Sequence, residues 1–166
     1  MTKLKTKKVV VIIAVLLLFI ASYLIYSRPM TIEQRYSMLT LDKCSGISGY
    51  YRDETMIESE KFTIGKNSQE YEMMCDLIYK KEYRRSIYDL LPRGTRIHRE
   101  EPGDFQWEVY FYFKDIEFPD GSMGAGAMLH IQNWYGDLDI YFDGERLTCY
   151  TDEQESWVKE VFDIIR

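Results

Sequence analysis

The sequence predicts a single α+β domain behind one N-terminal membrane helix, and three features of the chain support this prediction. An uncharged apolar run covers residues 9–26. Short alternating segments separated by glycine turns occupy residues 106–150, which is typical of an antiparallel meander. An amphipathic segment ends the chain. Together they predict a four- to six-stranded antiparallel sheet with about two helices packed on one of its faces.

The apolar run is long enough to cross a bilayer. From Val9 to Tyr26 it contains no charged residue, and a helix of this length spans about 27 Å, close to the hydrocarbon thickness of a membrane. A cleaved signal peptide is the alternative, but its apolar part is shorter and ends at small residues, for which only Ala21 and Ser22 stand inside the run. The length therefore favours a retained signal-anchor helix in a single-pass protein.

The charges beside the helix predict its orientation. Lysines concentrate before it, and lysine-rich flanks stay in the cytoplasm; they are Lys3, Lys5, Lys7 and Lys8. We therefore expect a short cytoplasmic tail (1–8), a transmembrane helix (9–26), a juxtamembrane spacer or short helix (27–40) and an extracytoplasmic domain (41–166). The expected location is the cell membrane, with the C-terminal domain outside.

The composition excludes one broad class of partner. The formal net charge is −6, and the four tail lysines leave −10 for residues 27–166. An acidic domain lacks the basic field that nucleic-acid binding needs, so no nucleic-acid partner is expected. Aromatic residues make up 15% of the chain and supply ample apolar surface for a folded core.

The first half of the domain predicts two strands and a helix. Short β-branched stretches at 41–51 and 57–64 flank the polar turn 52–55, which indicates a pair of strands. After Gly65, the segment 67–81 offers Asn67 or Ser68 as helix N-cap and has an apolar stripe at helical spacing.

The second half predicts a meander closed by a helix. In 106–114 the apolar side chains Trp107, Val109, Phe111 and Phe113 alternate with polar ones, so one face of this strand belongs to the core. Turns then separate three further strands, at 127–133, 138–142 and 146–150. The segment Thr151–Gln154 matches a capping box and predicts a C-terminal helix with an apolar face.

No motif points to catalysis, a metal or a cofactor. The histidines, His98 and His130, lack partners at metal-ligand spacing. The acidic string 137–144 resembles a calcium loop, but its glycine is misplaced and its alternation indicates a strand. A nucleophile elbow around Ser48 fails, because Tyr50 stands where glycine is required. No cofactor is expected.

The three cysteines leave two alternatives open. One disulfide could form among Cys44, Cys75 and Cys149, with one thiol left over, because the domain is expected outside the cytosol. Alternatively, all three are buried and act as small apolar side chains, as the position of Cys75 on the apolar stripe suggests.

The first candidate binding feature is the basic run, residues 80–99, which has a net charge of +5 in an acidic domain. Beside a membrane it could bind anionic lipid, an anionic wall polymer or an acidic protein. Alternatively it is a solvated face neutralised by the domain's own acids. Its basic residues are Lys80, Lys81, Arg84, Arg85, Arg93, Arg96 and Arg99.

The second candidate is the tyrosine face, the outward side of the sheet if the strand order is sequential. Tyrosine combines a broad contact area with a hydrogen-bonding tip, which suits peptide or carbohydrate partners. Alternatively, the tyrosines reflect strand propensity, or a helix covers them. The residues are Tyr110, Tyr112, His130, Gln132, Asp139 and Tyr141.

These features favour a membrane-anchored, extracytoplasmic binding or interaction module without catalytic activity. One alternative is a membrane-tethered inhibitor or protective protein. Another is a small envelope enzyme, a hydrolase that uses a pair of carboxylates. The candidates for such a pair are Glu100, Glu101, Asp104, Glu108, Asp137 and Asp139.

Overall fold

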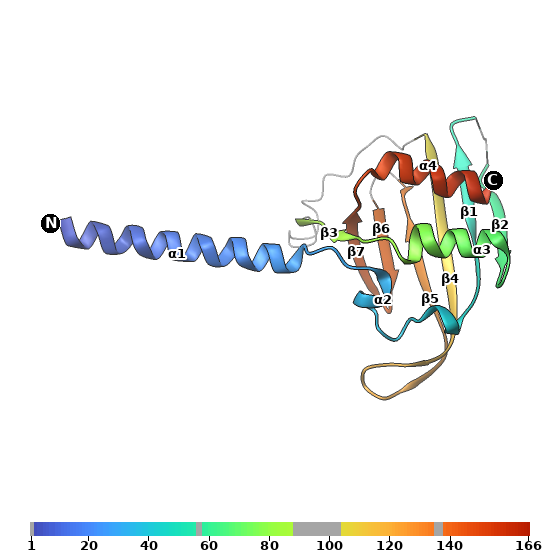
Figure 1. Cartoon of the computed structure of the whole chain (residues 1–166), viewed down its shortest axis with the longest axis horizontal. Helices are drawn as coiled ribbons and strands as arrows, with labels where there is room; N and C mark the ends of the chain where they lie inside the picture. Colours follow the sequence, from blue (N-terminus) through green and yellow to red (C-terminus); the bar gives the residue numbers. More distant parts are fainter. Residues whose placement is uncertain (1, 56–57, 88–103, 135–137) are drawn as a thin grey trace.

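The computed structural model describes residues 2–55, 58–87, 104–134 and 138–166. A long N-terminal helix projects from one α+β body (Figure 1). The helices are α1 (Thr2–Tyr26), α2 (Ile32–Arg35), α3 (Gln69–Met74) and α4 (Gln154–Ile165), with a 3₁₀ turn, η1 (Leu41–Lys43), and a π-helical turn, η2 (Cys75–Tyr79). The strands are β1 (Cys44–Asp53), β2 (Glu60–Gly65), β3 (Arg84–Arg85), β4 (Phe105–Glu117), β5 (Met123–Gln132), β6 (Leu138–Phe142) and β7 (Glu145–Tyr150).

Helix α1 contains the expected apolar segment. The 19-residue stretch from Lys8 to Tyr26 is uncharged after Lys8 and long enough to cross a membrane, and none of it is buried inside the described part of the protein. Large side chains such as Phe19 and Ile25 are 71% and 72% exposed. A helix that is apolar on all sides is stable only in apolar surroundings.

The sheet is antiparallel throughout, and its order is β2-β1-β4-β5-β6-β7-β3. Strands β4 to β7 are neighbours in sequence order, so the predicted meander and its α+β class are confirmed. The expected number of strands was too low, because the described residues form seven. The smallest is β3, which is only two residues long and pairs with β7. A strand this short leaves no alternating pattern in the sequence.

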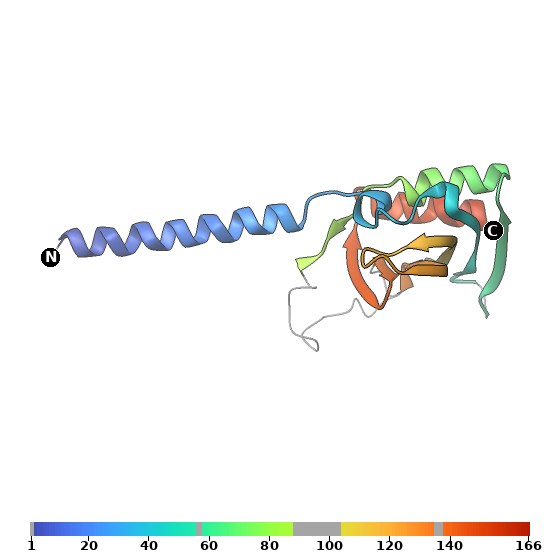
Figure 2. The ribbon, with the colours of Figure 1, turned by 90° about the horizontal axis from the view of Figure 1, so that it is seen from below.

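All the described helices of the domain lie on one side of the sheet, as Figure 2 shows. The alternation of β4 therefore separates a covered face from the tyrosine face. Trp107, Val109 and Phe111 are fully buried under the helices, and Phe113 is 2% exposed. The predicted core face of this strand is confirmed.

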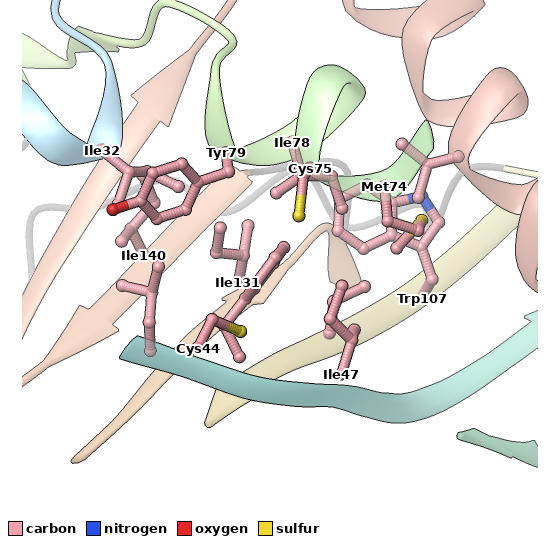
Figure 3. Close-up of a cluster of buried hydrophobic side chains, with 14 of the residues drawn as sticks. Ile32, Cys44, Ile47, Met74, Cys75, Ile78, Tyr79, Trp107, Ile131 and Ile140 are labelled. Carbon is pink, nitrogen blue, oxygen red and sulfur yellow. The ribbon is translucent and has the colours of Figure 1, made fainter. Parts of the chain in front are cut away.

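The two buried tryptophans tie the helices to the sheet. Their rings meet edge to face, with centroids 5.4 Å apart. Trp107 Nε1 donates to the carbonyl of Val158 in α4 at 3.1 Å, and Trp157 Nε1 donates to the carbonyl of Leu77 in η2 at 2.6 Å. Each indole thus has its polar group satisfied inside an apolar core. Figure 3 shows Trp107 in this core.

The two helix starts differ in how well their caps could be predicted. Ser68 caps α3 as expected, since its Oγ accepts from the Tyr71 amide at 3.1 Å. The capping box at Thr151 is absent: the N-cap of α4 is Glu153, in left-handed conformation. The Thr151 hydroxyl instead donates to the carbonyl of Glu82 at 3.0 Å. A tertiary hydrogen bond has replaced the local one.

The segment 27–40, expected as a spacer or a short helix, contains helix α2 and packs into the core. Thr31 and Gln34 form a capping box at the start of α2, and Ile32 and Leu39 are almost completely buried. Met30 pairs with Tyr83 through two backbone hydrogen bonds, of 3.1 and 2.9 Å. The domain therefore begins only a few residues after the end of α1.

Candidate functional site

The tyrosine face carries no helix among the described elements, and the strand register aligns its side chains in rows. In one row Tyr110 lies opposite His130, His130 opposite Tyr141, and Tyr141 opposite Arg146. The neighbouring row joins Glu108, Gln132, Asp139 and Thr148 in the same way. Most of the residues expected to project together are thus adjacent across three strands, β4, β5 and β6.

The first row forms a continuous stack, which we call the ring ladder (Tyr110, His130, Tyr141 and Arg146). The rings of Tyr110 and His130 are stacked with centroids 4.4 Å apart and an interplanar angle of 20°. His130 and Tyr141 are stacked at 5.1 Å and 18°. The Arg146 guanidinium lies 5.6 Å from the Tyr141 centroid, a cation–π distance.

Asp139 lies on the tyrosine face but does not project from it. It is 2% exposed. Its carboxylate accepts from Arg146 Nη2 at 2.7 Å and from Thr148 Oγ1 at 3.0 Å. The expectation that it is exposed for binding is therefore wrong, because its cross-strand neighbours enclose it. Asp139 instead holds Arg146 in place at the end of the ring ladder.

Glu108 supports the other end of the ladder. Its Oε2 lies 3.4 Å from His130 Nε2, although this contact is not a hydrogen bond, and the buried Nε2 has no hydrogen-bond partner among the described residues. Burial and the Glu108 carboxylate raise the pKa of Tyr110 to about 12, which keeps this phenol protonated at neutral pH. Gln132 Nε2 donates to the Tyr141 hydroxyl at 3.1 Å.

His130 should make the stability of the domain depend on pH. Burial lowers its pKa from the ordinary value, and the Glu108 and Asp139 carboxylates oppose this effect only in part. The unfolded chain therefore binds the proton more readily than the folded domain, and stability should fall as the pH drops below about 6.5. Urea unfolding at pH 7.5 and 5.5 would show this loss.

A His130→Phe variant is the matched control for this prediction, because it keeps a stacked ring without a titrating group. It should lose less stability than the original protein between these two pH values. An equal loss in both proteins would assign the pH dependence to other groups.

The exposed part of the tyrosine face lies beside the ladder. Three large side chains stand in solvent there: Tyr50 at 38%, Tyr112 at 40% and Met128 at 47% exposure. The Tyr112 hydroxyl is hydrogen-bonded to Ser48 Oγ at 3.0 Å, which fixes the ring. Tyr50 and Met128 were absent from the sequence-based set, because their places depend on strand pairing, which sets Tyr50 opposite Glu108 and Met128 opposite Tyr112.

The described part of the basic run is divided between two places. Lys80 forms a 2.5 Å salt bridge with Asp76 at the end of η2, and Lys81 is half-buried nearby. Arg84 and Arg85 form β3, where the Arg85 guanidinium lies 5.3 Å from the Tyr26 ring of α1. Arg93, Arg96 and Arg99 lie outside the described residues.

The carboxylates proposed for a hydrolase are only partly described. Glu100, Glu101 and Asp137 lie outside the described residues. Glu108 and Asp139 stand two strands apart, about 10 Å by strand spacing, with Gln132 between them. Asp104 is exposed just before β4. Among the described residues, no group of three or more potential ligands could hold a metal ion.

The cysteines are free thiols, and all three are buried. Cys44 and Cys75 face the core between β1 and η2 (Figure 3). Burial raises the pKa of Cys75 to about 11, so its thiol is protonated and unreactive at neutral pH. The structure thus presents them as small apolar side chains.

No protein-family model, curated protein or solved structure matches the chain.

Proposed function

We propose that this protein is a membrane-anchored binding module whose partner docks on the tyrosine face outside the cell. Helix α1 spans the membrane as a retained signal anchor, with the lysine-rich tail in the cytoplasm. The proposal draws support from the length and apolarity of α1, which is not buried in the described part of the domain, and from the lysines before it.

The ring ladder is the observation that carries the binding role. The hydrogen bonds of the buried Asp139 carboxylate hold Arg146 at one end of the ladder, the rings stack on one another, and Tyr50, Tyr112 and Met128 stand exposed on the same face. Rigid aromatic side chains lose little conformational entropy on binding, and they dominate the energy of protein interfaces. The engagement of Asp139 with Arg146 and Thr148 favours a supporting role for this carboxylate over a catalytic one.

Photo-crosslinking in intact membranes tests the proposal. A benzoylphenylalanine in place of Tyr112, in the full-length protein, should form a discrete adduct with the partner. Tyr50→Ala combined with Met128→Ala should reduce the adduct at least about tenfold, because removing an interface anchor costs about 2 kcal/mol or more. Exposed substitutions of this kind leave the domain folded.

The matched control carries the same photoreactive group in place of Met73, which is 42% exposed on α3, on the helical side of the sheet. It should give no such adduct. Identical adducts from both positions, or a yield at position 112 that the double substitution leaves unchanged, would refute docking on the tyrosine face.

A further inference from the structure

Arg85 and Arg35 lie close together where helix α1 meets the domain, and Arg28 stands in the link between α1 and the domain. Strand β3 lies beside the C-terminal end of α1 in both views (Figures 1 and 2). The Arg85 guanidinium lies 5.3 Å from the centroid of the Tyr26 ring, and Tyr26 is the last residue of α1. Arg28 follows two residues later and is exposed.

Helix α2 brings the third arginine to the same place. Arg35 Nη2 donates to the carbonyl of Tyr83 at 3.4 Å, and Tyr83 pairs with Met30. Burial lowers the pKa of Arg35, and the positive charge of Arg85 acts in the same direction. The two guanidinium groups are therefore close enough to repel one another.

The charge of this arginine cluster (Arg28, Arg35 and Arg85) is not balanced in the part of the chain that the structure describes. No salt bridge there joins any of the three to a carboxylate. Among the residues that the structure describes, the buried Arg85 Nε has no hydrogen-bond partner. The ion pair of Arg84, next to it in the chain, is with the exposed Asp152 at 3.9 Å and contributes little.

We propose that the arginine cluster binds the phosphate of an anionic phospholipid in the leaflet where α1 leaves the membrane. This inference rests on the proposed anchoring by α1. A tyrosine at the end of such a helix lies at the depth of the headgroups, so the guanidinium beside Tyr26 lies at that depth too. Guanidinium groups bind phosphate oxygens through paired hydrogen bonds, which would also satisfy Arg85 Nε.

The position of the cluster favours a lipid over a soluble polymer or protein. Because α1 anchors the protein, it keeps Arg85 permanently next to the anionic bilayer surface, and it does this for no soluble partner. Binding there would fix the angle of the domain relative to the membrane. The tyrosine face would then point in a defined direction.

The test uses the full-length protein in nanodiscs made of phosphatidylcholine alone or with 40% phosphatidylglycerol, and it measures the melting temperature of the domain. A ligand that binds only the folded state raises this temperature. We expect a rise of about 4 °C with phosphatidylglycerol. The negative charge of the bilayer surface alone would lower the melting temperature, because it repels an acidic domain.

Arg28→Gln combined with Arg85→Gln should abolish the rise. A matched control, Lys61→Gln with Lys114→Gln, removes the same charge from exposed sites on β2 and β4 and should keep it. Arg28→Gln alone, at an exposed position, should reduce the rise, and it keeps the test valid if Arg85 is needed for folding.

Two results would overturn the inference: the absence of any rise in the original protein, or an equal rise in the Arg28 and Arg85 variants. Alkaline carbonate extraction of cell membranes separates this failure from that of the anchor. If the protein stays in the membrane pellet, only lipid binding is overturned. If carbonate releases it, the anchor is refuted and lipid binding with it.

Discussion

Replacing Trp107 with alanine is expected to lower the free energy of unfolding by about 3–5 kcal/mol, the usual cost of removing a large aromatic side chain from a core. Trp107 is fully buried. It packs edge to face on Trp157 and donates to the carbonyl of Val158. The substitution leaves a cavity between β4 and α4 and an unpaired carbonyl. Urea denaturation followed by circular dichroism would measure the loss.

Lys114→Ala is the control on the same strand, because this side chain is exposed. It should change stability by no more than about 0.5 kcal/mol. A Trp107→Ala variant as stable as this control would contradict the register of β4 and the packing of α4 on it.

Gly49→Ala is expected to have a comparably large effect through overpacking. A Cβ at Gly49 would lie 1.9 Å from the backbone oxygen of Glu108 and 2.8 Å from the Phe62 ring. The first contact is with the backbone of the neighbouring strand, so β1 and β4 must separate. We expect a loss of about 3 kcal/mol, the upper end for an added methyl group in a packed core. A thermal melt should show a decrease of about 6–12 °C.

Gly65→Ala provides the matched comparison, because a Cβ there would meet no atom within 4 Å. Both glycines lie on the β1–β2 hairpin, and neither has a positive φ. This second variant should be at least as stable as the original protein. A similar loss in both would mean that the clash at Gly49 is relieved elsewhere.

Much of the fold could be predicted because strand alternation and turns are local signals. The bounds of β6 match the prediction, and the core face of β4 is the predicted one. Strand β3 could not be predicted, because two residues are too few to show an alternating pattern. Its two arginines are placed by pairing with β7. The capping box at Thr151 failed for the same reason, because a distant carbonyl took its hydroxyl.

The alignment of the candidate site's side chains across the strands could be predicted, but the burial of each side chain could not. Alternation placed Tyr110, His130 and Tyr141 on one face, and the sequential strand order aligned them. Alternation cannot show which polar side chain is enclosed by its neighbours. Asp139 is therefore buried against expectation, and Arg146 was not recognised as the end of the ladder.

The sequence by itself determined the apolar helix, the acidic charge of the domain, its α+β class and the two faces of β4, because each follows from composition or from a period of a few residues. Only the tertiary structure decided which groups each charged side chain contacts. Arg35 contacts the carbonyl of Tyr83 across 48 residues of chain, and Arg85 reaches Tyr26 from β3. Such contacts depend on how strands and helices pack, and no local pattern in the sequence records them.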